Sequence, residues 1–121
     1  MRTLDYTIVF VADMRRSVKF YREVMGLGLK FESPEWSEMI TGGCTLALHK
    51  SDGNTLSSKG WESGTCQLGF KVKDIAAFHK EVTGKGIRVL REPKQEEFGK
   101  LAVYADPDGL GISIMEMPEH K

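Results

Sequence analysis

The stretch that decides the fold is VADMRRSVKFYREVMGLGL, residues 11–29. Its apolar residues recur at steps of three and four, which predicts an amphipathic helix. Asp13 stands where a helix N-cap accepts a backbone N–H, and Gly26 can adopt the left-handed conformation that ends a helix. The residues before it, TLDYTIVFV at 3–11, are β-branched and aromatic, so they predict a strand that leads into the helix.

Three further segments predict strands after this helix: LKFES at 29–33, SEMI at 37–40 and CTLALHK at 44–50. Gly42 and Gly43 separate the last two segments, and a Gly-Gly pair in such a place is a hairpin signal. Residues 1–51 therefore predict one β-α-β-β-β module.

The next residues, 52–64, are rich in Ser, Gly, Asp and Asn and lack apolar periodicity, so they predict a connector. After it the pattern restarts, with a strand at 66–72, a helix capped by Asp74 and ended by Gly84 and Gly86, and strands at 87–93, 100–105 and 111–117. The last two strands are joined by Asp106-Pro107-Asp108-Gly109. Pro107 presets φ in this turn, and Gly109 supplies the positive φ that leads into the next strand.

The two halves share the same motif between strand and helix. Val11-x-Asp13 and Val72-x-Asp74 lie 61 residues apart, each after a predicted strand and before a predicted helix. We therefore predict an α+β fold that contains the βαβββ module twice, at residues 1–51 and 65–121, packed as one compact domain.

Charge and hydropathy exclude several classes of partner. Seventeen basic and seventeen acidic side chains cancel, so no net charge concentrates the protein on nucleic acid or on an acidic membrane surface. No apolar stretch approaches the ~20 residues that span a bilayer, and the N-terminal residues lack a signal peptide's apolar segment. We expect a cytoplasmic protein without nucleic-acid or membrane partners. Cys44 and Cys66 form no Cys-x-x-Cys pair, and we expect two buried free thiols.

Several motifs run through both halves: Val11-Ala12-Asp13, Ser17-Val18, Phe20-Tyr21 and Met25-Gly26-Leu27 in the first, and Phe98-Gly99 and Asp106-Pro107-Asp108-Gly109 in the second. Together they resemble the vicinal oxygen chelate superfamily, which holds glyoxalase I, bleomycin-resistance proteins and extradiol dioxygenases. The resemblance covers the whole chain. It implies that each module curls a mixed sheet into a half-open cup, and that a homodimer completes two cups from both subunits.

The resemblance also implies where a metal would be held. Metal-using members place a His or Gln in the first strand, a Glu in the fourth, a His in the fifth and a Glu in the eighth. Counting seven residues back from each capping Asp, and aligning the later strands, gives Tyr6, Ala47, Gln67 and Ser113 at these positions. Only Gln67 offers a suitable metal ligand. A single amide oxygen does not offset the free energy that a divalent cation loses when its water is removed. We therefore predict no metal and no other cofactor.

A divalent metal at a non-standard site is the minority alternative. His49 lies two residues beyond Ala47 on the same strand face, and Glu116 reaches the face of Ser113 only if a bulge intervenes. With Gln67, these residues would support a glyoxalase-like lyase or a dioxygenase. A metal-free enzyme, in which His49 or Tyr6 moves a proton, is a further alternative. His79 is expected to be a structural helix residue.

The function that these residues favour is metal-independent binding of a mostly apolar or aromatic small molecule in a cup at the dimer interface. Large aromatic side chains such as Trp36 and Trp61 offer flat surfaces for stacking. The predicted ligand-binding residues are Tyr6, Ile8, Trp36, Ala47, His49, Trp61, Gln67 and Ser113. Whether any reaction is catalysed stays open. So does a third possibility, in which the cup is filled by its own side chains and the fold serves dimerisation or regulation.

Overall fold

The computed structural model describes residues 1–51 and 66–117. The chain divides into two compact units, Met1–Leu56 and Ser57–Lys121, which we call unit 1 and unit 2 and describe separately. The predicted connector, residues 52–64, lies outside the described residues, and so does Trp61. Among the described residues, no helix is long and apolar enough to cross a membrane.

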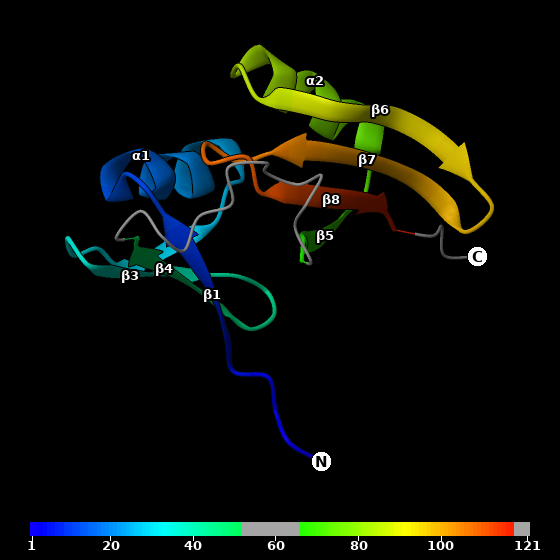
Figure 1. The fold of residues 1–121 in the computed structure, drawn as a ribbon. Coiled ribbons are helices and arrows are strands. Elements are labelled where there is room, and N and C mark those ends of the chain that lie inside the picture. The colour runs from blue at the N-terminus through cyan, green and yellow to red at the C-terminus, as the bar shows by residue number, and fades with distance from the viewer. Residues whose placement is uncertain (52–65, 118–121) are drawn as a thin grey trace. The chain divides into compact units, whose positions relative to one another are not determined.

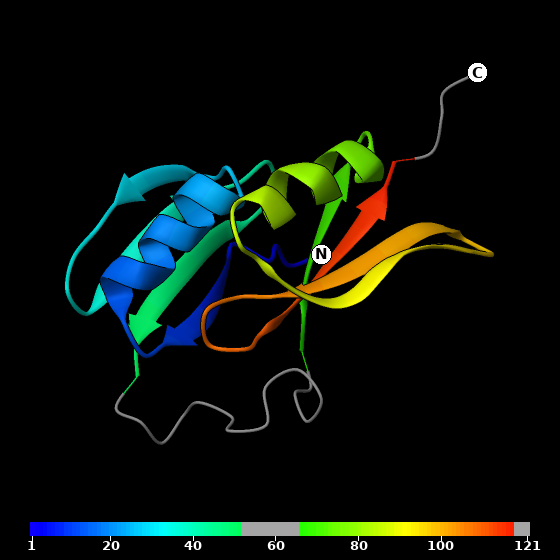
Figure 2. The same cartoon turned by 90° about the horizontal axis from the view of Figure 1, so that it is seen from above.

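Unit 1 is a four-stranded mixed sheet with a helical segment on one side (Figures 1 and 2). Its elements are β1 (Tyr6–Val11), α1 (Met14–Lys19), the π-helical η1 (Phe20–Val24), β2 (Gly28–Phe31), β3 (Trp36–Ile40) and β4 (Thr45–Lys50). The strand order is β1-β4-β3-β2, with β1 parallel to β4 and the other pairs antiparallel. β4 therefore lies between the first strand of the module and the predicted hairpin partner, β3.

Unit 2 repeats this architecture. Its elements are β5 (Leu68–Val72), α2 (Ile75–Gly84), β6 (Arg88–Glu96), β7 (Gly99–Ala105) and β8 (Gly111–Glu116). The strand order is β5-β8-β7-β6, again with the first strand parallel to the last and the other pairs antiparallel. The predicted α+β fold with two βαβββ modules is confirmed.

Each helix begins at the predicted aspartate. Asp13 and Asp74 are both extended, with φ of −132° and −137°, and their carboxylates accept backbone N–H groups at 3.1 and 3.0 Å. These donors belong to Arg16 and Ala77, three residues into each helix, as expected for an N-cap. The same local chemistry therefore starts both helices.

The first helix does not continue as one regular α-helix to Gly26. It is α-helical to Lys19 and then widens into η1, where the N–H of Met25 donates to the carbonyl of Phe20 at 3.1 Å. Phe20 and Tyr21 are consecutive, yet both are buried, and their rings meet edge to face with centroids 5.0 Å apart. Apolar periodicity alone does not distinguish this geometry from an α-helix.

The sixth strand is longer than predicted, since β6 runs past residue 93 to Glu96. Pro93 lacks an N–H for the ladder, and the pairing with β7 shifts its register between Arg91 and Lys94. A proline is tolerated in a strand at such an irregularity, which is why the strand continues beyond it.

The predicted turn between β7 and β8 is confirmed. The carboxylate of Asp106 accepts the N–H groups of Asp108 and Leu110, both at 2.9 Å, and Gly109 has a φ of 89°.

The thiol prediction holds only in part: Cys44 and Cys66 are both free, but Cys44 is half-buried and Cys66 is exposed. Cys66 is exposed because it precedes β5, outside the paired part of the sheet.

The core of unit 1 lies between α1 and one face of its sheet. Met14, Val18 and Tyr21 are buried on the helical side, and the sheet contributes Val9, Val11, Met39, Leu46 and Leu48. Because side chains alternate along a strand, the residues between these positions belong to the opposite face. That second face of unit 1 carries the candidate site.

Candidate functional site

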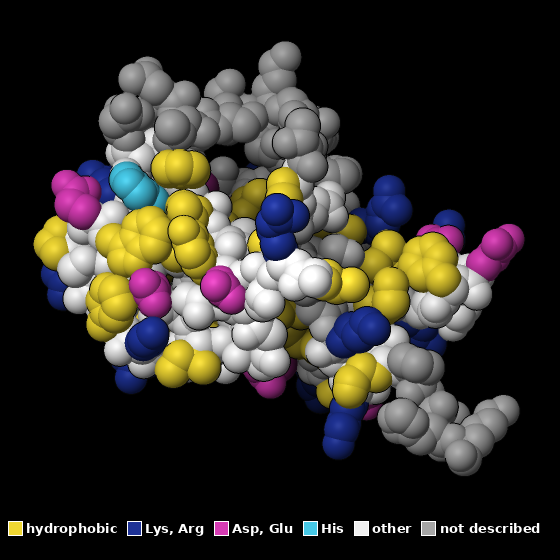
Figure 3. Space-filling model, turned by 90° about the horizontal axis from the view of Figure 1, so that it is seen from below, with side chains coloured by type: hydrophobic (Ala, Val, Ile, Leu, Met, Phe, Trp, Pro, Cys, Tyr) yellow, Lys and Arg dark blue, Asp and Glu magenta, His cyan; other side chains and the backbone are white. Residues whose placement is uncertain are grey.

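The candidate site is the sheet face of unit 1 that points away from α1. In the ladder, Phe10 pairs with His49 and His49 with Trp36, while Ile8 pairs with Ala47 and Ala47 with Glu38. Directly paired residues share a face, so these side chains lie together with Tyr6. We call this set the aromatic face: Tyr6, Ile8, Phe10, Trp36, Glu38, Ala47 and His49. Figure 3 shows hydrophobic side chains gathered beside a histidine on this side of unit 1.

Aromatic rings form a connected cluster on this face. The ring of Trp36 lies 6.5 Å from that of Tyr6 and 5.8 Å from that of His49, in both cases nearly perpendicular. Phe10 lies 5.3 Å from His49 on the other side. Edge-to-face pairs of this kind are favourable arrangements for aromatic rings. Strand order produces the cluster, because β4 lies between β1 and β3.

The indole of Trp36 reaches across the strand next to its own. Its Nε1–H donates to Glu38 Oε2 at 2.9 Å, and Glu38 Oε1 lies 3.6 Å from Lys30 Nζ. Since Trp36 pairs with His49 but its ring approaches Tyr6, the indole extends over Ala47, whose side chain is fully buried. The methyl group of Ala47 thus leaves room for the indole.

The imidazole of His49 is held by its own strand. Its Nδ1 lies 2.7 Å from the carbonyl oxygen of Lys50. A carbonyl oxygen only accepts hydrogen bonds, so Nδ1 carries the proton and the neutral ring has a bare Nε2. His49 is exposed, and it therefore presents a hydrogen-bond acceptor at the surface.

The remaining predicted residues that the structure describes belong to unit 2. Ser113 pairs with Gly69 and Val103, and Gln67 precedes β5 beside Gly111 of β8. A Cβ on Gly111 would come within 3.1 Å of the Gln67 side chain, so the glycine makes room for that amide. Gln67 and Ser113 share the sheet face of unit 2 that points away from α2.

Glu116, which entered the alternative metal set only if β8 contained a bulge, lies on the other face. The pairing of β5 with β8 is unbroken from the pair Leu68–Ile112 to the pair Val72–Glu116. Glu116 Oε2 accepts the backbone N–H of Ile75 at 3.0 Å. Its carboxylate thus caps the start of α2, on the helical side of the sheet. Glu116 does not join Ser113.

The positions where the resemblance implies metal ligands do not fit a divalent cation. They present a phenol, a methyl group, an amide and a hydroxyl, at Tyr6, Ala47, Gln67 and Ser113. Hard cations need several oxygen or imidazole ligands, and this donor set has neither a carboxylate nor an imidazole. Within residues 1–51 and 66–117, no three His, Cys, Asp or Glu side chains are grouped to hold a metal ion.

Sequence reasoning missed two residues of the aromatic face. Phe10 lies two residues after Ile8 in β1, and Glu38 lies two residues after Trp36 in β3. The period-two alternation of strands was the signal that could have found both. Glu38 also provides a carboxylate in the row of Ala47, on the neighbouring strand.

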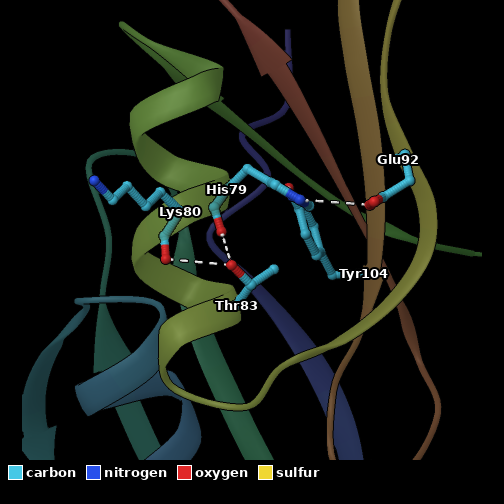
Figure 4. Close-up of polar contacts among 5 residues, drawn as sticks. All are labelled: His79, Lys80, Thr83, Glu92 and Tyr104. Carbon is cyan, nitrogen blue, oxygen red and sulfur yellow. Dashed lines mark hydrogen bonds and ion pairs between the residues drawn. The ribbon is translucent and has the colours of Figure 1, made fainter.

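A second titratable cluster joins α2 to the sheet of unit 2 (Figure 4). His79 Nδ1 lies 2.9 Å from Tyr104 Oη, and His79 Nε2 lies 3.4 Å from Glu92 Oε2. Burial of Tyr104, and then the negative charge of Glu92, raise the pKa of the phenol to about 12. His79 is partly buried, with a side chain 25% exposed, in agreement with the structural role predicted for it.

The fold and the sequence together define the class of this protein. Residues 3–114 match the family model of the Glyoxalase/Bleomycin resistance protein/Dioxygenase superfamily, and the chain belongs to this superfamily.

The curated relatives include proteins that are named as lyases. The chain is 32% identical to the lactoylglutathione lyase of Haemophilus influenzae over 92% of its length and 90% of the relative. It is 27% identical to a probable lactoylglutathione lyase of Synechocystis sp., with 98% of both chains covered. A glyoxalase-related enzyme from Fulvimarina pelagi has the same fold, with a TM-score of 0.80 at 21% identity over 98% of this chain and 90% of that one.

Proposed function

We propose that this protein binds a mostly apolar, aromatic small molecule on the aromatic face of unit 1 without a metal. The observation that carries the proposal is the exposure of large apolar side chains on one face: Tyr6 is 55% exposed, Ile8 40% and Phe10 37%. Burying apolar surface is favourable, and a contiguous exposed set marks an interaction site more often than isolated residues do.

The geometry of the rings supports a flat ligand. Tyr6 and Trp36 meet at 76°, so a planar molecule can stack on one ring while its edge meets the other. Glu38 and His49 place a few polar atoms among apolar surfaces, which is the usual composition of a small-molecule site. In unit 2, Gln67 and Ser113 remain proposed ligand contacts.

The proposal includes a homodimer and a cytoplasmic location. Phe31 and Ile40, 42% and 54% exposed, extend the apolar surface of the sheet in unit 1, and a second copy that covers them would complete a cup. Two free cysteines agree with a reducing compartment. Analytical ultracentrifugation tests the dimer, and a monomer at micromolar concentration would contradict this part.

Thermal unfolding with a panel of neutral bicyclic aromatic compounds tests the binding proposal. A ligand at a hundred times its Kd stabilises the folded state by about 2.7 kcal/mol, which is a clear rise in Tm. The Trp36→Ala variant should lose this rise, because it removes the largest ring of the face. Phe98→Ala is the matched control, since Phe98 is an aromatic residue 64% exposed in the turn between β6 and β7. No rise with any compound would refute the proposal.

The names of the relatives favour a second candidate, a lactoylglutathione lyase-like enzyme. The donor set at the four implied ligand positions argues against a metal-dependent version. The test is an assay of lactoylglutathione formation, with and without added nickel, zinc, manganese or iron. Turnover that rises with one of these metals would replace the binding proposal by this enzyme.

A further inference from the structure

We propose that the ligand is an aromatic molecule with an O–H or N–H group that donates a hydrogen bond to Nε2 of His49. The inference rests on the proposed function, because it names the class of ligand for the same face. Two observations carry it: the direction of the His49 hydrogen bond and the engagement of the neighbouring side-chain N–H group of Trp36.

The hydrogen bond to Lys50 determines what His49 can offer. Since the carbonyl oxygen takes the proton of Nδ1 at 2.7 Å, the neutral imidazole has an unprotonated Nε2 on its other edge. Within residues 1–51 and 66–117, Nε2 has no hydrogen-bond partner. Nε2 can therefore accept a hydrogen bond from a ligand.

The imidazole is also held in place by its neighbours. Phe10 lies 5.3 Å away on one side and Trp36 5.8 Å away on the other. Rings so placed restrict rotation of the imidazole, so Nε2 keeps a defined direction. A ligand that stacks on Trp36 or Phe10 lies next to the ring of His49.

The neighbouring polar groups favour the same class of ligand. The indole N–H of Trp36 is already donated to Glu38 at 2.9 Å, and Glu38 itself is an acceptor. A ligand with only acceptor groups cannot bind the N–H groups of Trp36 and neutral His49, because these already donate to Glu38 and Lys50. A ligand that brings a donor meets an acceptor with no protein partner.

The decisive experiment compares two probes that share one ring system, of which only the first has a hydrogen-bond donor. 2-Naphthol carries an O–H group, and 2-methoxynaphthalene has the same rings with that hydrogen replaced by methyl. Their affinities for the full-length protein at pH 7.5 are measured by isothermal titration calorimetry. We expect 2-naphthol to bind about fivefold more tightly, as one net hydrogen bond provides.

Two variants assign this preference to Nε2. His49→Phe keeps an aromatic ring without an acceptor and should bind both probes equally, at the affinity of the wild type for 2-methoxynaphthalene. His49→Gln restores an acceptor oxygen and should recover part of the preference. His49 is exposed, and thermal unfolding verifies that both variants stay folded.

The outcomes separate this inference from the proposed function. Equal binding of both probes by the wild type overturns the inference and leaves the proposed function standing. A preference that persists in His49→Phe also overturns it, because another acceptor would then be responsible. If the wild type binds neither probe, the inference is overturned, whereas the proposed function fails only if the wider panel of aromatic compounds also gives no rise in Tm.

Discussion

Tyr104 and His79 are joined by a hydrogen bond of 2.9 Å between Oη and Nδ1, which connects β7 to α2 (Figure 4). Tyr104 is fully buried, and the ring of Phe78 lies 5.6 Å from its ring. Glu92 lies 3.4 Å from the other nitrogen of His79. A neutral Tyr104 can donate its proton to Nδ1 while Nε2–H points to Glu92, so every polar group in the row has a partner.

This arrangement predicts a loss of stability at alkaline pH. The pKa of Tyr104 is raised from 10.0 to about 12 in the folded state, so the unfolded chain releases the proton first as the pH rises. The contribution of Tyr104 is complete below pH 10 and is lost progressively up to about pH 12. Urea unfolding between pH 9 and pH 11 measures this slope.

Tyr104→Phe is the control for that measurement. It removes the titrating group, so its free energy of unfolding should fall less steeply with pH than that of the wild type. At neutral pH it should cost about 1 kcal/mol, the usual value of one hydrogen bond. An equal slope in both proteins would show that other groups cause the alkaline loss.

The paired N-caps should contribute similarly to stability. Asp13→Ala and Asp74→Ala each remove one carboxylate that accepts a backbone N–H in the first turn, and each should cost about 1 kcal/mol. The matched Asn variants keep an acceptor and should cost less. Chemical unfolding followed by circular dichroism gives these values, and a cost confined to one of the two sites would contradict their equivalence.

Substitution of Glu116 should change the stability of the protein but not its affinity for a ligand. Glu116→Ala leaves the N–H of Ile75 without its side-chain acceptor and should destabilise the protein by about 1 kcal/mol, whereas Glu116→Gln keeps an oxygen there. Neither variant should change the affinity for an aromatic probe, because the carboxylate lies on the helical face of its sheet. Reduced affinity in a folded Glu116→Gln variant would contradict this placement.

Ala47 should control how Trp36 lies on the aromatic face. Its side chain is fully buried in the row between Ile8 and Glu38, so Ala47→Leu overfills that space and should cost about 1–3 kcal/mol. The displaced indole should also weaken binding of an aromatic probe. Ala47→Gly adds no bulk and serves as the control in the same calorimetric titration. Unchanged binding by Ala47→Leu would show that Trp36 is not part of the site.

Much of the fold could be predicted from the sequence because its signals are local. Asp13 and Asp74 cap helices through contacts three residues away, and strand alternation needs only the neighbouring residues. Their repetition after 61 residues was enough to predict two modules. Alternation along a single strand also placed Ala47 with His49.

The tertiary structure decided what these local patterns leave open. It paired β1 with β4, which brings Tyr6 and Trp36 together although they are far apart in the chain. It also put Glu116 under α2 and Glu38 beside Ala47. Strand order and register depend on the summed packing of distant segments, and no short stretch of sequence contains that sum. The sequence by itself determined which residues of one strand share a face. The assembled sheet determined which residues of different strands lie side by side on that face.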